Sequence, residues 1–75
     1  MVVIKPSQIR GARAMLGMTQ TELAKLAGLS KTGLLNIENG ASDPKASTLT
    51  AIQTALERAG IEFLEGARPG VRLRK

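Results

Sequence analysis

The sequence lacks cysteine and histidine, and its only aromatic residue is Phe63. Without cysteine or histidine, the chain cannot form a disulfide, a Cys or His metal site, a cysteine nucleophile or a histidine base. We therefore expect no catalytic centre, no metal and no cofactor. The acidic pair Glu62 and Glu65 is close in sequence but has no catalytic residue type beside it, and it is interpreted as solvated charge.

A long apolar run and a signal-peptide pattern are also lacking, so we expect a cytoplasmic protein with no membrane contact. The 75 residues include 11 lysines and arginines and 6 acidic residues, a net charge of +5. Residues 1–21 and 66–75 contain basic residues and no acid, which favours polyanionic partners. The scarcity of aromatic rings disfavours single-stranded nucleic acid, which binds by stacking. Nothing in the sequence indicates a small-molecule ligand.

Residues 19–40, TQTELAKLAGLSKTGLLNIENG, predict two short helices joined by a tight turn. Thr19 and Glu22 have the spacing of a reciprocal capping box at the start of the first of these helices. Gly28 lies in the turn, and Ser30 can cap the helix that follows. A glycine-containing turn between two short helices is typical of a helix-turn-helix, whose second helix enters the major groove of DNA.

Two more helices are expected around this pair, within one domain of 75 residues that has a helical core over 6–59. The first helix is expected over 6–16, where Pro6 suits the opening turn because that turn needs no N–H donor. Ser47 is expected to cap a fourth helix that runs to about residue 59 and stops at Gly60. Gly11 weakens the first helix slightly.

The pattern changes to alternation after residue 60 and predicts a β-hairpin over 61–74, with a loop at 65–69. The favoured register places Ile61 opposite Leu73 and Phe63 opposite Val71, because a slip of one residue would put Phe63 opposite a charged side chain. An isolated hairpin is marginal in water, so this one is expected to pack on the helices or to extend across a dimer. These four apolar residues, together with residues 2–4, are the candidates for a dimer interface.

The chain resembles the lambda-repressor and Cro-like helix-turn-helix proteins, also called the XRE family. The resemblance lies in Arg13, Thr19–Gln20, Glu22–Ala24, Ala27–Ser30, Ile37–Gly40 and Leu49–Leu56. It implies a mainly α fold, a lambda-repressor-like domain of four helices with a short C-terminal β-hairpin. It also implies a regulator of transcription that binds double-stranded DNA sequence-specifically. We expect a repressor that acts as a homodimer on a palindromic operator.

The third helix is the expected reader of DNA bases. In the family, the first turn and the middle of this helix reach base edges, and by resemblance that role falls on Lys31, Thr32, Leu35 and Asn36. The helical wheel agrees, because these residues lie outside when Leu34 and Ile37 point inward. Asparagine can pair with adenine, lysine can donate to guanine, and apolar groups can touch the thymine methyl. A merely solvated polar face would show the same pattern.

Phosphate contacts are expected from Gln20, Lys45, Arg10 and Asn39. Gln20 stands at the start of the second helix, where unpaired backbone N–H groups attract phosphate. The alternative is an ordinary helix-start glutamine that bonds to its own backbone. Arg13 and Glu38 are expected, by resemblance, to form a structural ion pair between the first helix and the end of the third.

Several alternatives stay open. The same fold could be a protein-interaction module, such as an antitoxin or an antiactivator, whose third helix docks on protein and leaves no specific DNA footprint. RNA is disfavoured because its A-form major groove does not admit a helix. The basic end, Arg72, Arg74 and Lys75, could be a phosphate-binding tail, a solvated strand edge that blocks aggregation, or a dimer contact.

Overall fold

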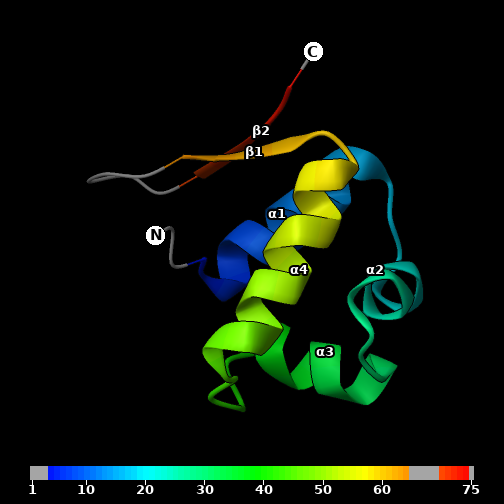
Figure 1. Cartoon of the computed structure of the whole chain (residues 1–75), viewed down its shortest axis with the longest axis vertical. Coiled ribbons are helices and arrows are strands. Elements are labelled where there is room, and N and C mark those ends of the chain that lie inside the picture. The colour runs from blue at the N-terminus through cyan, green and yellow to red at the C-terminus, as the bar shows by residue number, and fades with distance from the viewer. Residues whose placement is uncertain (1–3, 65–69, 75) are drawn as a thin grey trace.

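The computed structural model describes residues 4–64 and 70–74, which form four α-helices followed by two β-strands. The elements are α1 (Pro6–Leu16), α2 (Gln20–Ala27), α3 (Lys31–Glu38), α4 (Ala46–Arg58), β1 (Ile61–Leu64) and β2 (Gly70–Leu73). Figure 1 shows α3 at one end of the molecule and the strands at the other, with α1, α2 and α4 between them. The predicted fold class, mainly helical with a C-terminal hairpin, is confirmed.

The starts of α2 and α3 form as the sequence predicts. The N–H of Glu22 donates to Thr19 Oγ1 at 3.0 Å, and the N–H of Thr19 donates to Glu22 Oε1 at 2.9 Å. Ser30 Oγ accepts from the N–H of Gly33 at 3.0 Å. The turn between the two helices uses the left-handed conformation of Gly28, whose φ is 72° and which glycine adopts without a steric penalty.

The start of α4 differs from the expectation that Ser47 caps it. The helix begins at Ala46, and Lys45 occupies the capping position with an extended backbone and no side-chain hydrogen bond. Ser47 therefore lies inside the first turn. A capping side chain stabilises a helix start but does not by itself determine where the helix begins. Here Pro44, whose ring fixes φ, stands just before the capping residue Lys45, and the helix that follows buries Ile52.

The hydrophobic core lies between the helices and the inner face of the hairpin. Its buried members are Ile4, Ile9, Ala12, Leu23, Ala24, Leu34, Ile37, Ile52, Leu56, Ile61 and Phe63. The predicted inward positions of the first helix are buried at Ile9 and Ala12 and half-buried at Leu16. A chain of this size buries only about 60 % of the surface that its unfolded form exposes, so each buried residue matters for stability.

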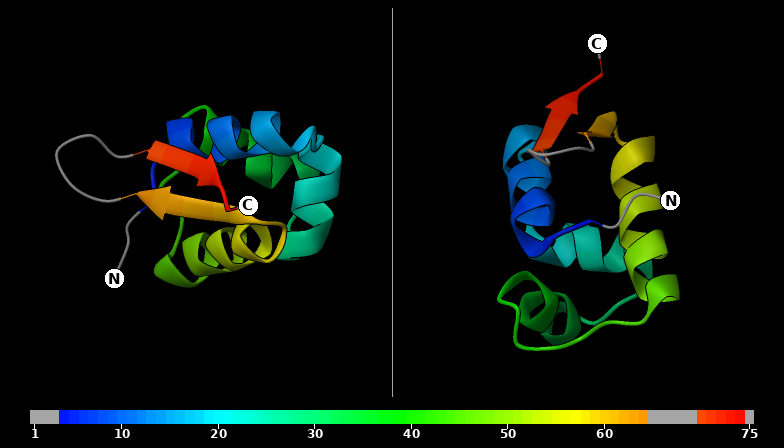
Figure 2. Two further views of the ribbon diagram at one scale, coloured as in Figure 1. Left: turned by 90° about the horizontal axis from the view of Figure 1, so that it is seen from above. Right: turned by 90° about the vertical axis from the view of Figure 1, so that its left-hand side faces the viewer.

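The two strands pair antiparallel in the predicted register. Ile61 lies opposite Leu73, and Phe63 lies opposite Val71. On the outer face, Arg72 Nε donates to Glu62 Oε1 at 2.9 Å. β1 packs on α4 and β2 packs on α1, so the hairpin closes the end of the helical core (Figure 2). The predicted loop at 65–69 lies outside the described residues.

Two residues of α1 hold β2 close to the helix. A Cβ atom added to Gly11 would lie 3.4 Å from Val71 Cγ2, so β2 packs directly against the helix at this position. Gln8 is buried; its Nε2 donates to the Gly70 carbonyl at 3.1 Å, and its Oε1 accepts from the Lys5 N–H at 2.8 Å. Sequence reasoning did not assign Gln8 a role, because both of its partners are backbone groups.

No helix among residues 4–64 is both long enough and apolar enough to cross a membrane. Over the same residues and 70–74, acidic side chains do not gather in a group of three or more that could hold a metal ion.

Candidate nucleic-acid interface

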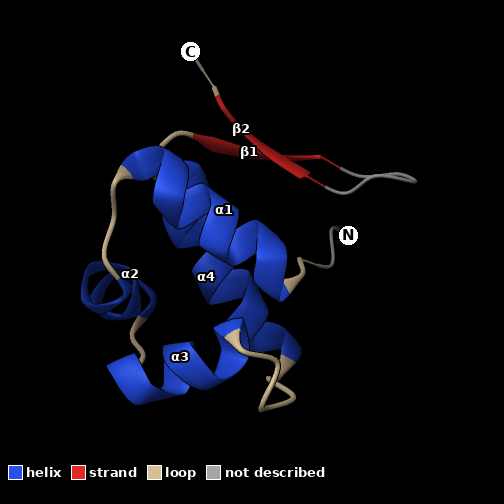
Figure 3. Cartoon of the chain, turned by 180° about the vertical axis from the view of Figure 1, so that it is seen from behind, coloured by secondary structure: helices blue, strands red, loops and turns tan. Residues whose placement is uncertain are grey.

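The outer face of α3 is exposed along the whole helix. The exposed residues are Lys31, Thr32, Leu35, Asn36 and, at the helix end, Asn39. Leu34 and Ile37 are buried on the opposite side. Figure 3 shows that α3 forms the edge of the molecule farthest from the hairpin. The four predicted base contacts therefore lie together on one accessible surface.

The N-terminus of α3 is held by its cap. Ser30 Oγ accepts from the Gly33 N–H, and a Cβ atom at Gly33 would lie only 3.1 Å from that oxygen. A glycine inside a helix costs about 1 kcal/mol relative to alanine. In the structure, this glycine leaves room for the capping hydroxyl.

The C-terminus of α3 is held by the buried carboxylate of Glu38, whose side chain is 1% exposed. Arg13 Nε and Nη2 of α1 donate to its two oxygens at 2.7 and 2.9 Å. Gln20 Nε2, at the start of α2, donates to Glu38 Oε1 at 3.0 Å. The predicted ion pair between Arg13 and Glu38 is present, and it belongs to a cluster that joins three helices.

Arginine side chains complete this Glu38 cluster, which we define as Arg10, Arg13, Gln20 and Glu38. Arg10 Nη1 donates to the backbone carbonyl of Glu38, and Arg13 Nη1 donates to the carbonyl of Met18 at 3.1 Å. The Glu38 carbonyl belongs to the last residue of α3, and the Met18 carbonyl comes just after α1. The C-terminal ends of helices attract positive charge. The cluster fixes the end of α3 relative to α1 and α2.

The charge state of Glu38 follows from these contacts. Burial by itself would raise the pKa of the carboxyl group. The hydrogen bonds from Arg13 and Gln20, together with the positive charges of Arg13 and Arg10, outweigh burial and hold the pKa of Glu38 below its usual value. Glu38 is therefore ionised at neutral pH, as an ion pair with Arg13 requires.

The four predicted phosphate contacts differ in their surroundings. Asn39 and Lys45 are exposed in the connection from α3 to α4. Gln20 and Arg10 instead use part of their donor capacity inside the Glu38 cluster. The alternative for Gln20 was a side chain that bonds to its own backbone, but its Nε2 instead donates to Glu38 Oε1. No pattern in one sequence reveals its bond to Glu38, because the two residues belong to different helices.

The structure restricts the residues proposed for a dimer interface. Ile61 and Phe63 are buried in the chain's own core, and so is Ile4, because the inner face of the hairpin packs on the helices. Val71 is half-buried, and Leu73 is 43% exposed. Of the described candidates, Leu73 is the one with substantial exposed surface, and residues 2 and 3 lie outside the described residues.

The basic C-terminal residues lie far from α3. Arg72 pairs with Glu62, and Arg74 Nη2 donates to the Glu57 carbonyl at 3.1 Å. The hairpin and α3 occupy opposite ends of the molecule, so these arginines do not extend the exposed face of α3 (Figure 1). Lys75 lies outside the described residues.

Known proteins share both this sequence pattern and this fold. A family model described as Helix-turn-helix matches residues 9–63. The solution structure of the DNA-binding domain of the P22 C2 repressor, residues 1–76, is similar with a TM-score of 0.66. That match has 28% sequence identity and covers 76% of each chain. No curated protein matches the sequence.

The matched region begins in α1 and ends in β1, so it includes the capped turn, the exposed face of α3 and the Glu38 cluster. This family consists of binding domains and not of enzymes. By the extent of that match and by its fold, the chain belongs to the XRE family of helix-turn-helix domains.

Proposed function

We propose that the protein is a transcriptional regulator, most simply a repressor, that binds double-stranded DNA sequence-specifically as a homodimer. One observation supports this function above the others: the outer face of α3 is exposed along the helix while both ends of the helix are fixed, by Ser30 and by Glu38. A helix held in this way can enter the major groove without reordering. The similar structure from the P22 C2 repressor is that of its DNA-binding domain.

Base recognition is assigned to Lys31, Thr32, Leu35 and Asn36. Asn36 can make a bidentate pair with adenine, and Lys31 can donate to guanine. Leu35, which is 37% exposed, can touch a thymine methyl. Each good bidentate pair contributes about 1–3 kcal/mol of discrimination against the wrong base.

Phosphate contacts are assigned to Gln20, Lys45, Arg10 and Asn39. The capping box of α2 uses the N–H groups of Thr19 and Glu22, which leaves those of Gln20 and Thr21 without a partner in the helix. Such N–H groups at a helix start favour phosphate. Arg10 has further guanidinium donors beyond the one that bonds to Glu38.

A homodimer is proposed because one short helix offers few base contacts. Two copies would read half-sites about 34 Å apart, or a multiple of that spacing. A twofold axis beside the C-terminal end of β2 would bring the exposed Leu73 side chains of two copies together. Leu73 is the proposed contact.

Selection from random duplex DNA, followed by sequencing, tests the proposal. We expect an enriched palindrome, and we expect its affinity to fall steeply with salt because phosphate-bound counterions are released on binding. Asn36→Ala, which changes only the exposed face of α3, is expected to alter the enriched sequence, whereas Gln53→Ala on α4 is not. A protein-interaction module would enrich no sequence, and that outcome would refute the proposal.

A further inference from the structure

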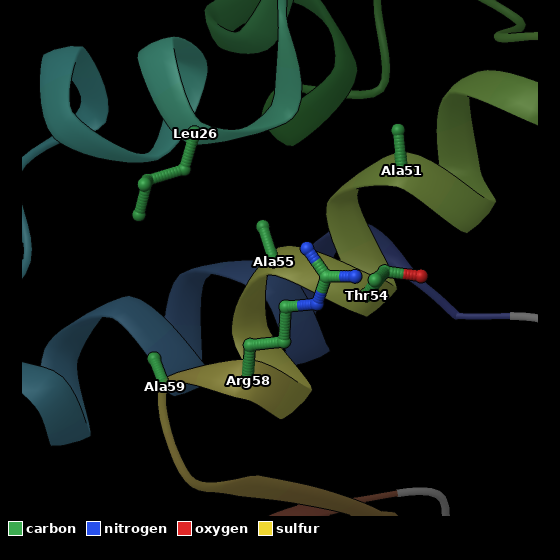
Figure 4. Close-up of a pocket in the computed structure, with 6 residues that line it drawn as sticks. All are labelled: Leu26, Ala51, Thr54, Ala55, Arg58 and Ala59. Atoms are coloured by element: carbon green, nitrogen blue, oxygen red, sulfur yellow. The ribbon is translucent and has the colours of Figure 1, made fainter.

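A shallow apolar groove of about 540 Å³ lies between α2 and α4. Its lining residues are Leu26, Ala51, Thr54, Ala55, Arg58 and Ala59. Figure 4 shows Leu26 extending from α2 toward α4, where the three alanines follow one another along the helix. The DNA-binding function proposed above uses none of these side chains.

The groove exists because a large side chain stands beside a row of small ones. Leu26 is 62% exposed, the largest exposure among the exposed large hydrophobic side chains of residues 4–64 and 70–74. Ala51, Ala55 and Ala59, the last of them the C-cap, repeat at every fourth residue, so they lie on one face of α4 and its C-terminal end. At 1.5 Å per residue, this row is about 12 Å long and matches about two turns of a second helix.

Arg58 is the one charged residue among those that line the groove. The neighbouring acids have partners of their own: Glu22 accepts from the Thr19 N–H at 2.9 Å, and Glu57 Oε2 accepts from Gln53 at 3.3 Å. Within residues 4–64 and 70–74, Arg58 forms no ion pair. Its side chain lies on the same face of α4 as Thr54, one turn earlier, and borders the apolar floor (Figure 4).

We propose that this groove binds an acidic amphipathic helix of a partner protein. An aliphatic side chain of that helix would pack between Leu26 and Ala55, and a carboxylate about one turn away would pair with Arg58. Amphipathic helices commonly bind in this manner, with their apolar side in a hydrophobic groove. A second copy of this chain fits less well, because no acidic residue lines the groove and a twofold axis would bring two Arg58 side chains toward each other.

The position of the groove keeps this contact apart from the outer face of α3. The groove lies on the α2 side of the molecule, whereas the outer face of α3 points away from the hairpin at one end (Figures 1 and 4). A partner in the groove therefore leaves the outer face of α3 open. The proposal does not depend on DNA binding, because its residues and those assigned to DNA are separate.

The test uses helical peptides selected by display. The library consists of peptides of about 15 residues that all carry leucines along one helical face. The positions that flank this face are randomised. The best binder is then compared with a copy in which each acid is replaced by lysine. We expect acidic flanks to be enriched, the acidic peptide to bind at least about tenfold tighter, and backbone amide shifts on binding to map to residues 51–59.

Variants of the protein make the assignment specific. Leu26→Ser is expected to weaken binding of the selected peptide about tenfold. Ala59→Gln is expected to weaken binding because its side chain fills the groove. Arg58→Glu is expected to reverse the preference, so that the lysine copy binds more tightly than the acidic peptide. Met15→Ser changes an exposed apolar residue of α1, and Lys5→Glu makes the same charge change away from the groove. Both controls are expected to bind like the wild-type protein.

Four results would each overturn the proposal. The first is that no peptide is enriched, and the second is that the acidic and lysine peptides bind equally. The third is that the controls weaken binding as much as Leu26→Ser does. The fourth is that the protein alone self-associates and Leu26→Ser makes it monomeric, since a second copy would then occupy the groove.

Discussion

Arg13 Nε lies 2.7 Å from Glu38 Oε2, and this contact joins α1 to the last residue of α3. Only 1% of the Glu38 side chain and 19% of the Arg13 side chain are exposed. Gln20 adds a neutral donor from α2. A pair buried in this way fixes geometry more than it adds net stability, since desolvation offsets much of the attraction. Its role here is to set the angle at which α3 projects.

Arg13→Ala is expected to destabilise the fold and, as a consequence, to weaken DNA binding. Loss of Arg13 removes the ion-pair partner of the buried Glu38 and leaves only Gln20 and the charge of Arg10 near its carboxylate. Removal of one partner of a buried ion pair costs about 3–5 kcal/mol. Thermal or urea unfolding measures this loss directly. Lys25→Ala, an exposed basic residue of α2, is the matched control and should change stability little. If Arg13→Ala abolishes DNA binding with an unchanged melting temperature, Arg13 contacts DNA directly.

The stabilising effect of Glu38 should depend on pH. Because its pKa is lowered in the folded protein, the ionised carboxylate stabilises the fold fully above the unfolded glutamate value of about 4.3. That contribution is lost as the pH falls through the lower pKa of the folded state. The difference in unfolding free energy between the wild type and Glu38→Gln should therefore be largest at neutral pH and shrink in acid. A difference that is independent of pH would contradict this assignment.

Ser30 and Gly33 should be energetically coupled. Removal of the cap by Ser30→Ala costs about 1 kcal/mol. Gly33→Ala gains up to about 1 kcal/mol of helix propensity, but its Cβ would press on the capping hydroxyl at 3.1 Å. We expect Gly33→Ala to stabilise the Ser30→Ala variant more than it stabilises the wild type. A double-mutant cycle measured by urea unfolding tests this, and strict additivity would exclude the steric explanation.

Asn36→Ala should relax base specificity, whereas Lys45→Ala should not. We expect Asn36→Ala to lose about 1–3 kcal/mol of discrimination at one base pair of each half-site. Lys45→Ala should weaken all duplexes about equally and lower the salt slope by about one. Titrations of the selected site and its single-base variants distinguish the two effects. An unchanged specificity profile for Asn36→Ala would remove this residue from base recognition.

Leu73→Ser should weaken the proposed homodimer with little effect on folding. The side chain is 43% exposed, so little of its apolar area is lost from the chain's own core. Sedimentation equilibrium of the free protein and of its DNA complex measures the change. Met15→Ser removes a similarly exposed apolar group from α1 and is the control. If both variants associate like the wild type, the dimer contact lies elsewhere.

The local elements were predictable because their determinants are close in sequence. The capping box of Thr19 and Glu22 spans one turn, and the glycine turn at Gly28 needs only a left-handed residue. The hairpin register followed from alternation, since a slip of one residue would have placed Phe63 opposite a charged side chain. The exposed face of α3 likewise followed from the helical period of Leu34 and Ile37.

Other features depended on contacts between residues far apart in the chain. The bond of Gln20 to Glu38, the approach of Val71 to Gly11 and the burial of Ile61 and Phe63 arise when separate elements pack together. Periodicity shows which side of an element is apolar, but it does not show what covers that side. For this protein, the sequence alone determined the elements, most of their ends and the face that α3 presents, whereas the start of α4 at Ala46 differed from the predicted cap at Ser47. Only the tertiary structure decided which polar groups meet around Glu38, because that meeting requires three helices to be in place at once.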